Sequence, residues 1–223
     1  MDRISLSGGT FRIVRGGKEA SVVGDAIKLI VVDAAKVSRS YYASSFNPNA
    51  PAAPTCWSAD TTQPSPDVPK QNRQASRCMD CPQNIRGSSQ GGGRACRYAQ
   101  RLAVVLEDDL SKVYQLQLPA TSLFGRAQEG RMPMQAYAQH LASHNTPVIS
   151  VVTRCSFDPD STIPKLIFQA FRALEEQELN LVISLAQSGE TDEAISLNPP
   201  QQGQPFAEVN GFVYSSANAN QGD

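Results

Sequence analysis

The chain has 223 residues, 40% of them hydrophobic, which suits one domain with a large insertion or one domain with a small satellite. No segment approaches the run of about 18 apolar residues that a membrane-spanning helix needs, and the start of the chain lacks the apolar core of a secretion signal. The number of cysteines is odd, at five, so we expect reduced thiols or metal ligands rather than a disulfide framework.

The net charge of −1 hides an uneven distribution of charge along the chain. Residues 1–103 contain 14 Lys/Arg and 7 Asp/Glu, whereas residues 104–223 contain 6 and 14. An asymmetry of this kind favours a polyanion-binding surface in the first half of the chain. Mutual neutralisation of the two halves within the fold is the alternative, because net charge indicates partners only weakly.

The N-terminal segment predicts β-strands. Residues 10–14 alternate polar and apolar side chains, and residues 26–32 are rich in Ile and Val. Residues 36–42 are a third candidate strand. Paired glycines at 8–9 and 16–17 predict turns on either side of the first strand.

Residues 47–97 predict an insertion with almost no apolar side chains of its own. Six prolines lie in residues 47–70, and residues 87–93 are rich in Gly and Ser, so neither a helix nor a central strand is expected there. A loop of about 50 residues is improbable in a compact domain unless a cross-link or a bound ligand holds it in place. Four of the five cysteines lie in this insertion.

Regular structure is expected again from residue 98 onward. The predicted elements are strands at 103–106 and 113–118 joined by an acidic turn, a helix entry at 119–122, a helix at 133–144, a hairpin of strands at 147–155 and 165–171, and an acidic helix at 174–186. The order predicts a mainly β or α+β fold, an OB-like barrel with peripheral helices over residues 1–197. Residues 198–223 are polar and predict a flexible tail.

The cysteines of the insertion carry the strongest chemical signal. Cys78 and Cys81 form a CxxC pair, with Cys56 and Cys96 at a distance on either side. Zinc takes four tetrahedral N or S ligands, so these four thiolates predict a closed structural zinc site, with Arg77 and Arg97 favouring the ionised thiols. A redox or disulfide pair and unligated thiols remain alternatives. Cys155, in an apolar strand, is expected to be a small buried hydrophobe.

Basic and aromatic residues are interleaved in the first half. Single-stranded nucleic acid is bound by basic grooves that neutralise phosphates and by aromatic side chains that stack on bases. Each tyrosine taken alone is more often part of a core or rim. The candidate nucleic-acid-binding residues are Arg12, Arg15, Lys18, Lys36, Arg39, Tyr41, Tyr42, Trp57, Arg73, Arg77, Arg86, Arg94, Arg97, Tyr98 and Arg101.

Enzyme motifs receive little support from the sequence. His140 and His144 lack the Glu of an HExxH motif, and no P-loop or nucleophile elbow is present. Glu107, Asp108 and Asp109 could hold Mg²⁺ for a nuclease, but an acidic hairpin turn explains them more simply. We therefore expect a protein without catalytic activity and keep the nuclease as a weaker alternative.

Several short motifs resemble a group of proteins encoded by tailed bacteriophages, and the resemblance covers about residues 5–172. The cysteine pattern with its companions Pro82, Asn84 and Arg97 is its most specific part. The matching motifs are Ser7-Gly8-Gly9-x-Phe11-Arg12, Cys56-Trp57, Cys78-x-x-Cys81-Pro82-x-Asn84, Gly87, Ala95-Cys96-Arg97, Arg101-Leu102 and Leu118-Pro119-Ala120-Thr121-Ser122.

In design the chain is also similar to phage single-stranded-DNA-binding proteins, in which an OB-fold can carry a zinc-bearing insertion. The resemblance implies a non-catalytic role in replication or recombination, in the cytoplasm of the infected bacterial host, with single-stranded DNA and replication or host proteins as partners. Such proteins usually end in a dense acidic tail, whereas residues 198–223 contain two acidic residues. The alternative is a zinc-bearing protein that binds a host polymerase or defence factor.

Overall fold

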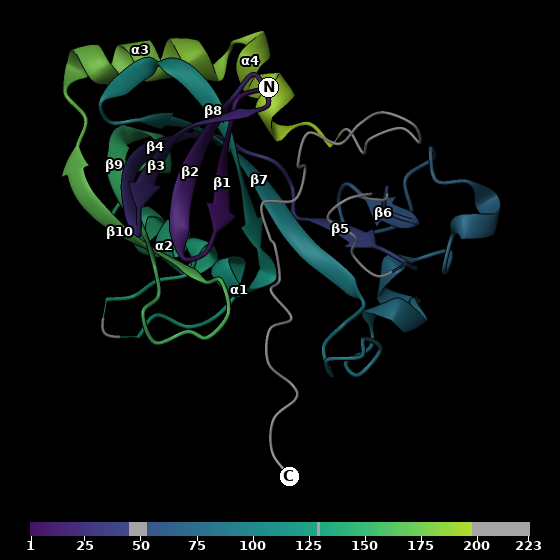
Figure 1. Cartoon of the computed structure of the whole chain (residues 1–223). Coiled ribbons are helices and arrows are strands. Elements are labelled where there is room, and N and C mark those ends of the chain that lie inside the picture. The colour runs from purple at the N-terminus through teal and green to yellow at the C-terminus, as the bar shows by residue number, and fades with distance from the viewer. Residues whose placement is uncertain (45–52, 129, 198–223) are drawn as a thin grey trace.

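The computed structural model describes residues 1–44, 53–128 and 130–197 (Figure 1). The predicted tail at 198–223 and the first residues of the predicted insertion lie outside this part. The strands are β1 (Arg3–Ser7), β2 (Thr10–Arg15), β3 (Lys18–Gly24), β4 (Ala26–Ala34), β5 (Ser38–Tyr41), β6 (Cys56–Ser58), β7 (Cys96–Leu106), β8 (Asp109–Pro119), β9 (Val151–Phe157) and β10 (Leu166–Ala173). The helices are α1 (Ala120–Leu123), α2 (Met134–Ser143), α3 (Glu176–Ala186) and α4 (Gly189–Ile195).

The strands form one curled sheet in the order β10-β9-β4-β7-β8-β1-β2-β3, with β5 joined to β7 and β6 joined to β5. β1 runs parallel to β8, whereas the other neighbours along the sheet run antiparallel. The sheet wraps into a half-barrel (Figure 1). The prediction of a mainly β fold is therefore confirmed, while its closer likeness to an OB barrel stays a prediction.

The central strands are apolar on both faces because both faces are covered. Leu29 and Val31 of β4 point into the cluster inside the curl, and Ile30 and Val32 point into a second cluster on the outer face. In β7 every residue from 102 to 106 is buried. Strands buried on both sides have continuous apolar sequences rather than alternating ones.

Helices close the two faces of this sheet. Tyr137 of α2 is fully buried inside the curl, where its hydroxyl lies 2.7 Å from that of Thr153. α3 and α4 lie across the outer face, and Val182 and Ala194 complete the outer cluster (Figure 1). None of the helices in the described residues is long and apolar enough to cross a membrane.

Residues 38–44 and 53–101 form an extension beside the half-barrel (Figure 1). Its sheet consists of β5, β6 and the first half of β7, and the second half of β7 continues into the core. Short 3-10 turns at Lys70–Asn72, Cys78–Asp80 and Pro82–Asn84 provide the rest of its regular structure within the described residues. The long strand β7 is thus the physical link between the extension and the core.

Candidate metal centre and nucleic-acid surface

Strand register brings two distant cysteines to one face of the extension. Tyr41 of β5 pairs with Cys56 of β6 on one side and with Cys96 of β7 on the other. Directly opposed residues of antiparallel strands point to the same face of a sheet. Cys56 and Cys96, 40 positions apart in the chain, therefore share the face that also carries Tyr41.

The CxxC segment lies against this face. The backbone N–H of Cys78 donates to the carbonyl of Thr62 at 2.9 Å, and a 3-10 turn over Cys78–Asp80 leads directly to Cys81. Pro82 then begins the next turn, as its fixed φ suits a first helical position. Both thiols of the CxxC are buried as a result.

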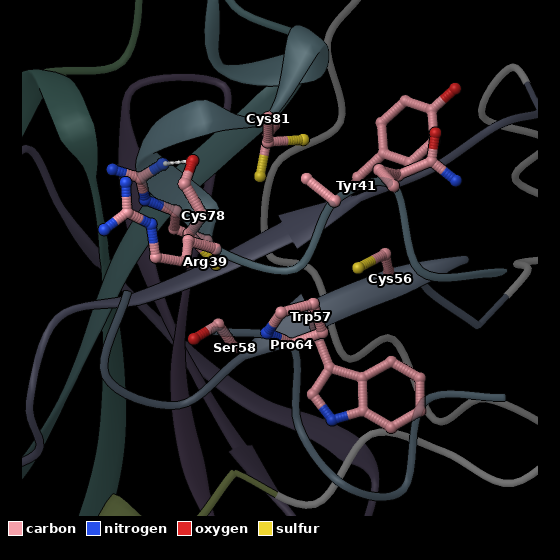
Figure 2. Close-up of a pocket in the computed structure, with 12 residues that line it drawn as sticks. Arg39, Tyr41, Cys56, Trp57, Ser58, Pro64, Cys78 and Cys81 are labelled. Atoms are coloured by element: carbon pink, nitrogen blue, oxygen red, sulfur yellow. Dashed lines mark hydrogen bonds between the residues drawn. The ribbon is translucent and has the colours of Figure 1, made fainter. Parts of the chain in front are cut away.

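All four cysteines line one small pocket of about 20 Å³ (Figure 2). A space of this size holds a water molecule or a single ion but no organic ligand. The labelled Cys56, Cys78 and Cys81 surround the space in Figure 2. All five cysteines belong to the described residues, and none of them forms a disulfide.

A donor set of four sulfur atoms fits zinc, which prefers thiolates in closed structural sites. As positioned, however, no three His, Cys, Asp or Glu side chains of the described residues are close enough together to form a ready metal site. Binding would therefore require the thiols to move inward around the pocket that they already share. Zinc at Cys56, Cys78, Cys81 and Cys96 stays a prediction.

The electrostatic surroundings connect the four thiols. Burial raises the pKa of Cys96 to about 12, Arg39 opposes this rise, and the neighbouring thiols add to it. Burial likewise raises the pKa of Cys56, against a hydrogen bond from the backbone N–H of Gln74 and the charge of Arg73. The sequence predicts that Arg77 and Arg97 favour the ionised thiols, but in the structure Arg73 acts on Cys56 and Arg39 on Cys96.

The extension has hardly any hydrophobic core besides these cysteines. Among its described residues, the buried hydrophobic side chains are the four cysteines and Val68. Pro54 and Pro64 are buried beside them. A segment that buries so little apolar surface needs another source of stability, and metal binding can supply it directly.

Two of the predicted nucleic-acid-binding residues form hydrogen bonds within the extension. Arg39 is 6% exposed. Its Nη1 donates to the carbonyl of Cys78 at 3.1 Å, and its Nη2 donates to the hydroxyl of Tyr98. The Cζ atom of Arg39 lies 4.2 Å from the centroid of the Tyr98 ring. Arg73 donates to the carbonyls of Val68 and Pro66 at 3.0 Å each. Both guanidiniums hold the loops of the extension, and a phosphate would have to compete with these bonds.

The other basic residues predicted to bind nucleic acid fall into two groups. Arg12, Arg15 and Lys18 lie on β2 and β3, away from the extension (Figure 1). Arg12 pairs with Glu19 at 2.7 Å, and Arg15 donates to the hydroxyl of Tyr114. The members that are exposed on the extension or just before it are Lys36, Arg77, Arg86, Arg94 and Arg97, of which Arg77 pairs with Asp80 at 2.7 Å.

The charge asymmetry of the sequence corresponds to a division of the fold. Residues 38–101 contain 8 Lys/Arg and 3 Asp/Glu, while the rest of the chain contains 12 and 18. The positive excess therefore belongs to the extension as a whole rather than to the N-terminal half. The four candidate aromatic residues, Tyr41, Tyr42, Trp57 and Tyr98, are in the extension as well and are half-buried.

The residues considered as candidates for catalysis lie on the main body, outside the extension. His140 and His144 are exposed on or next to α2, with ring centroids 4.6 Å apart. Glu107 is bonded to Lys28 and Arg172, and Asp109 accepts hydrogen bonds from Ser111. Glu107 and Asp108 thus form the β7–β8 turn, in the place where the sequence predicts an acidic turn, and Asp109 begins β8.

No protein-family model, no curated protein and no solved structure matches the chain.

Proposed function

We propose that this chain is a single-stranded-DNA-binding protein of a bacteriophage, acting without catalysis in replication or recombination. In this proposal the half-barrel is an OB-like scaffold, and the extension contacts the DNA. One zinc ion on Cys56, Cys78, Cys81 and Cys96 holds the extension together.

The observation that carries the proposal is the composition of the extension. Its described part combines four buried thiols around one pocket, a basic excess and half-buried aromatic side chains. Phosphate neutralisation by Arg and Lys supplies most of the affinity of non-specific nucleic-acid binding, and base stacking adds to it. An acidic main body with a basic extension also orients the molecule toward a polyanion.

Zinc would supply stability and no chemistry in this proposal. Four thiolate ligands leave no open coordination position for water or substrate. The four thiolates would together carry more negative charge than the ion neutralises, and Arg39 and Arg73 lie where they would offset the difference.

Fluorescence anisotropy with labelled single-stranded and duplex DNA of equal length, over a salt series, tests the proposal. We expect preference for the single strand and an affinity that falls as salt rises, because bound protein releases counterions from the phosphates. Absence of binding at low salt, or binding that strengthens with salt, would exclude this function.

A zinc-bearing protein that binds a host protein is the second candidate. Met79 and Ile85 of the extension are 70% and 63% exposed, and exposed apolar side chains of this kind suit a protein partner. Failure of the DNA titration at low salt, together with normal zinc content, would favour this candidate.

A further inference from the structure

The two faces of the extension sheet have different roles. On one face Cys56, Tyr41 and Cys96 stand in a row over the cysteine pocket. On the other face the register places Ser40 of β5 between Trp57 of β6 and Arg97 of β7. We call this second side the outer face, because along β7 it continues into the side of the sheet that α3 and α4 cover.

Arg101 extends this outer face along β7, four residues after Arg97 and on the same side because side chains alternate along a strand. Its guanidinium is half-buried and forms neither an ion pair nor a hydrogen bond with the described residues. Burial lowers its pKa to about 10, and the phenol of Tyr42 is near enough for its charge to act on it.

A half-buried arginine that no carboxylate among the described residues neutralises is costly for a protein to maintain. An anion that docks on the outer face would remove this cost by pairing with the guanidinium. Tyr42 is near Arg101, and Trp57 lies on the same face two strands away, level with Arg97. Both aromatic residues are half-buried, which suits contact with the faces of unpaired bases. The opposite face offers no such surface, because Arg39 and Tyr98 are bonded to each other there.

We infer that the outer face of the β6-β5-β7 sheet is the platform for single-stranded nucleic acid. Trp57 and Tyr42 stack on bases, and Arg97 and Arg101 bind the phosphates. The inference depends on the proposed function and narrows it to one face of the extension. A duplex would be a poor ligand, since its bases are stacked on one another and cannot reach the rings.

Trp57 is the one tryptophan of the chain and so reports on this face directly. An unlabelled oligothymidylate of about 16 nucleotides, the upper end of the site sizes of single OB folds, is titrated against intrinsic fluorescence. Anisotropy of a labelled copy is measured in parallel. We expect the tryptophan signal to be quenched with the same midpoint as the anisotropy change.

Paired variants test the arginine and the ring separately. Arg101→Gln and Trp57→Leu are compared with Arg154→Gln and Phe171→Leu, exposed residues on strands of the main body. We expect Trp57→Leu to weaken binding about 5- to 150-fold, the range for loss of one stacked base. Arg101→Gln should reduce the slope of log affinity against log salt by about 0.7, the value for one single-strand phosphate contact.

Three outcomes are distinct. No binding by the wild type in either assay would remove the proposed function itself. Binding detected by anisotropy with unchanged tryptophan fluorescence, and with Arg101→Gln equal to wild type, would overturn the outer-face assignment and leave the function standing. Quenching that persists in Arg154→Gln and Phe171→Leu, but weakens in Arg101→Gln, supports the assignment even if Trp57→Leu fails to fold.

Discussion

Cysteine residues in this protein differ by their surroundings rather than by their burial. All five are buried, but Cys155 is enclosed within the inner cluster on β9, where burial alone raises its pKa. The other four line one pocket and act on one another electrostatically. Cys155 is therefore a small hydrophobe, as the sequence predicts, and it provides a matched control for the metal hypothesis.

Replacing Cys81 with serine should remove zinc from the purified protein. Three thiolates and a hydroxyl form a much weaker site, because zinc is bound by the deprotonated thiol. Zinc is measured by atomic emission after gel filtration, and we expect about one ion per wild-type chain from a single closed four-ligand site. Cys155→Ala should keep the wild-type content. Equal zinc in Cys81→Ser and wild type would contradict the four-cysteine site.

Arg39 should matter for the stability of the extension rather than for DNA contact. Arg39→Met keeps most of the aliphatic part of the side chain but removes the guanidinium that donates to the carbonyl of Cys78, which then keeps only the longer bond of 3.4 Å from the N–H of Cys81. Loss of a hydrogen bond from a charged donor costs about 1.5–3 kcal/mol. We expect faster zinc release to a chromogenic chelator. Arg86→Met, an exposed substitution in the same extension, should release zinc at the wild-type rate. Equal rates in the two variants would argue against this supporting role.

At the scale of elements, the sequence predicts best the strands and helices that have a clear apolar pattern. β2, β4, β8, β10 and α2 occur where they are expected. β3 was missed because it is an edge strand without a buried residue, so no alternation marks it. The sequence pattern does not reveal β1 or α4 either, since both are short: β1 depends on pairing with β2 and β8, and α4 begins at a cap provided by Ser188.

The candidate site is only partly accessible to sequence reasoning. CxxC spacing predicts the metal ligands, because two thiols three positions apart can reach one ion. The roles of Arg39 and Arg73, and the separation of Trp57 from Tyr41 onto opposite faces, depend on strand register and loop packing. A shift of one residue in register would exchange these faces, so residue type alone cannot assign them.

The first turn of α3 should respond to acid through one ion pair. Arg172 holds Glu178 with two parallel hydrogen bonds of 2.7 and 2.8 Å, and this lowers the pKa of Glu178 from 4.5 to about 2. A carboxyl group whose pKa is lower in the folded state than in the unfolded state adds stability at pH values above its unfolded pKa. That stability disappears as the pH falls through the folded pKa. The contribution should therefore be lost between about pH 4.5 and about pH 2.

Glu178→Gln tests this directly, because glutamine still suits the third position of the capping box while the charge is removed. Urea unfolding should show the variant less stable than wild type at neutral pH, with the difference shrinking toward about pH 2 as wild-type Glu178 is protonated. Glu176→Gln, an exposed substitution in the same turn, is the control. A difference that stays constant with pH would rule out the ion pair as its cause.

Considered as a whole molecule, the chain combines two parts with different sources of stability. Neither hydrophobic cluster of the main body contains a residue of the extension among those the structure describes. The extension in turn buries its cysteines and Val68. Since apolar burial is the dominant stabilising term, the main body should remain folded when the extension does not.

Removal of zinc should therefore unfold one part of the molecule and spare the other. After prolonged treatment with excess EDTA, we expect trypsin to cleave rapidly at Arg86 and Arg94, DNA binding to be lost, and Trp57 fluorescence to shift to longer wavelength as the ring enters water. The main-body strands should keep their far-ultraviolet circular dichroism and a cooperative thermal transition, because neither of their hydrophobic clusters includes a described residue of the extension. Cys81→Ser should already show the EDTA-treated pattern and change no further. Loss of the whole fold in one transition would mean that the extension and the main body are a single cooperative unit. A trypsin cleavage pattern that EDTA does not change would mean that the thiols hold no structural ion.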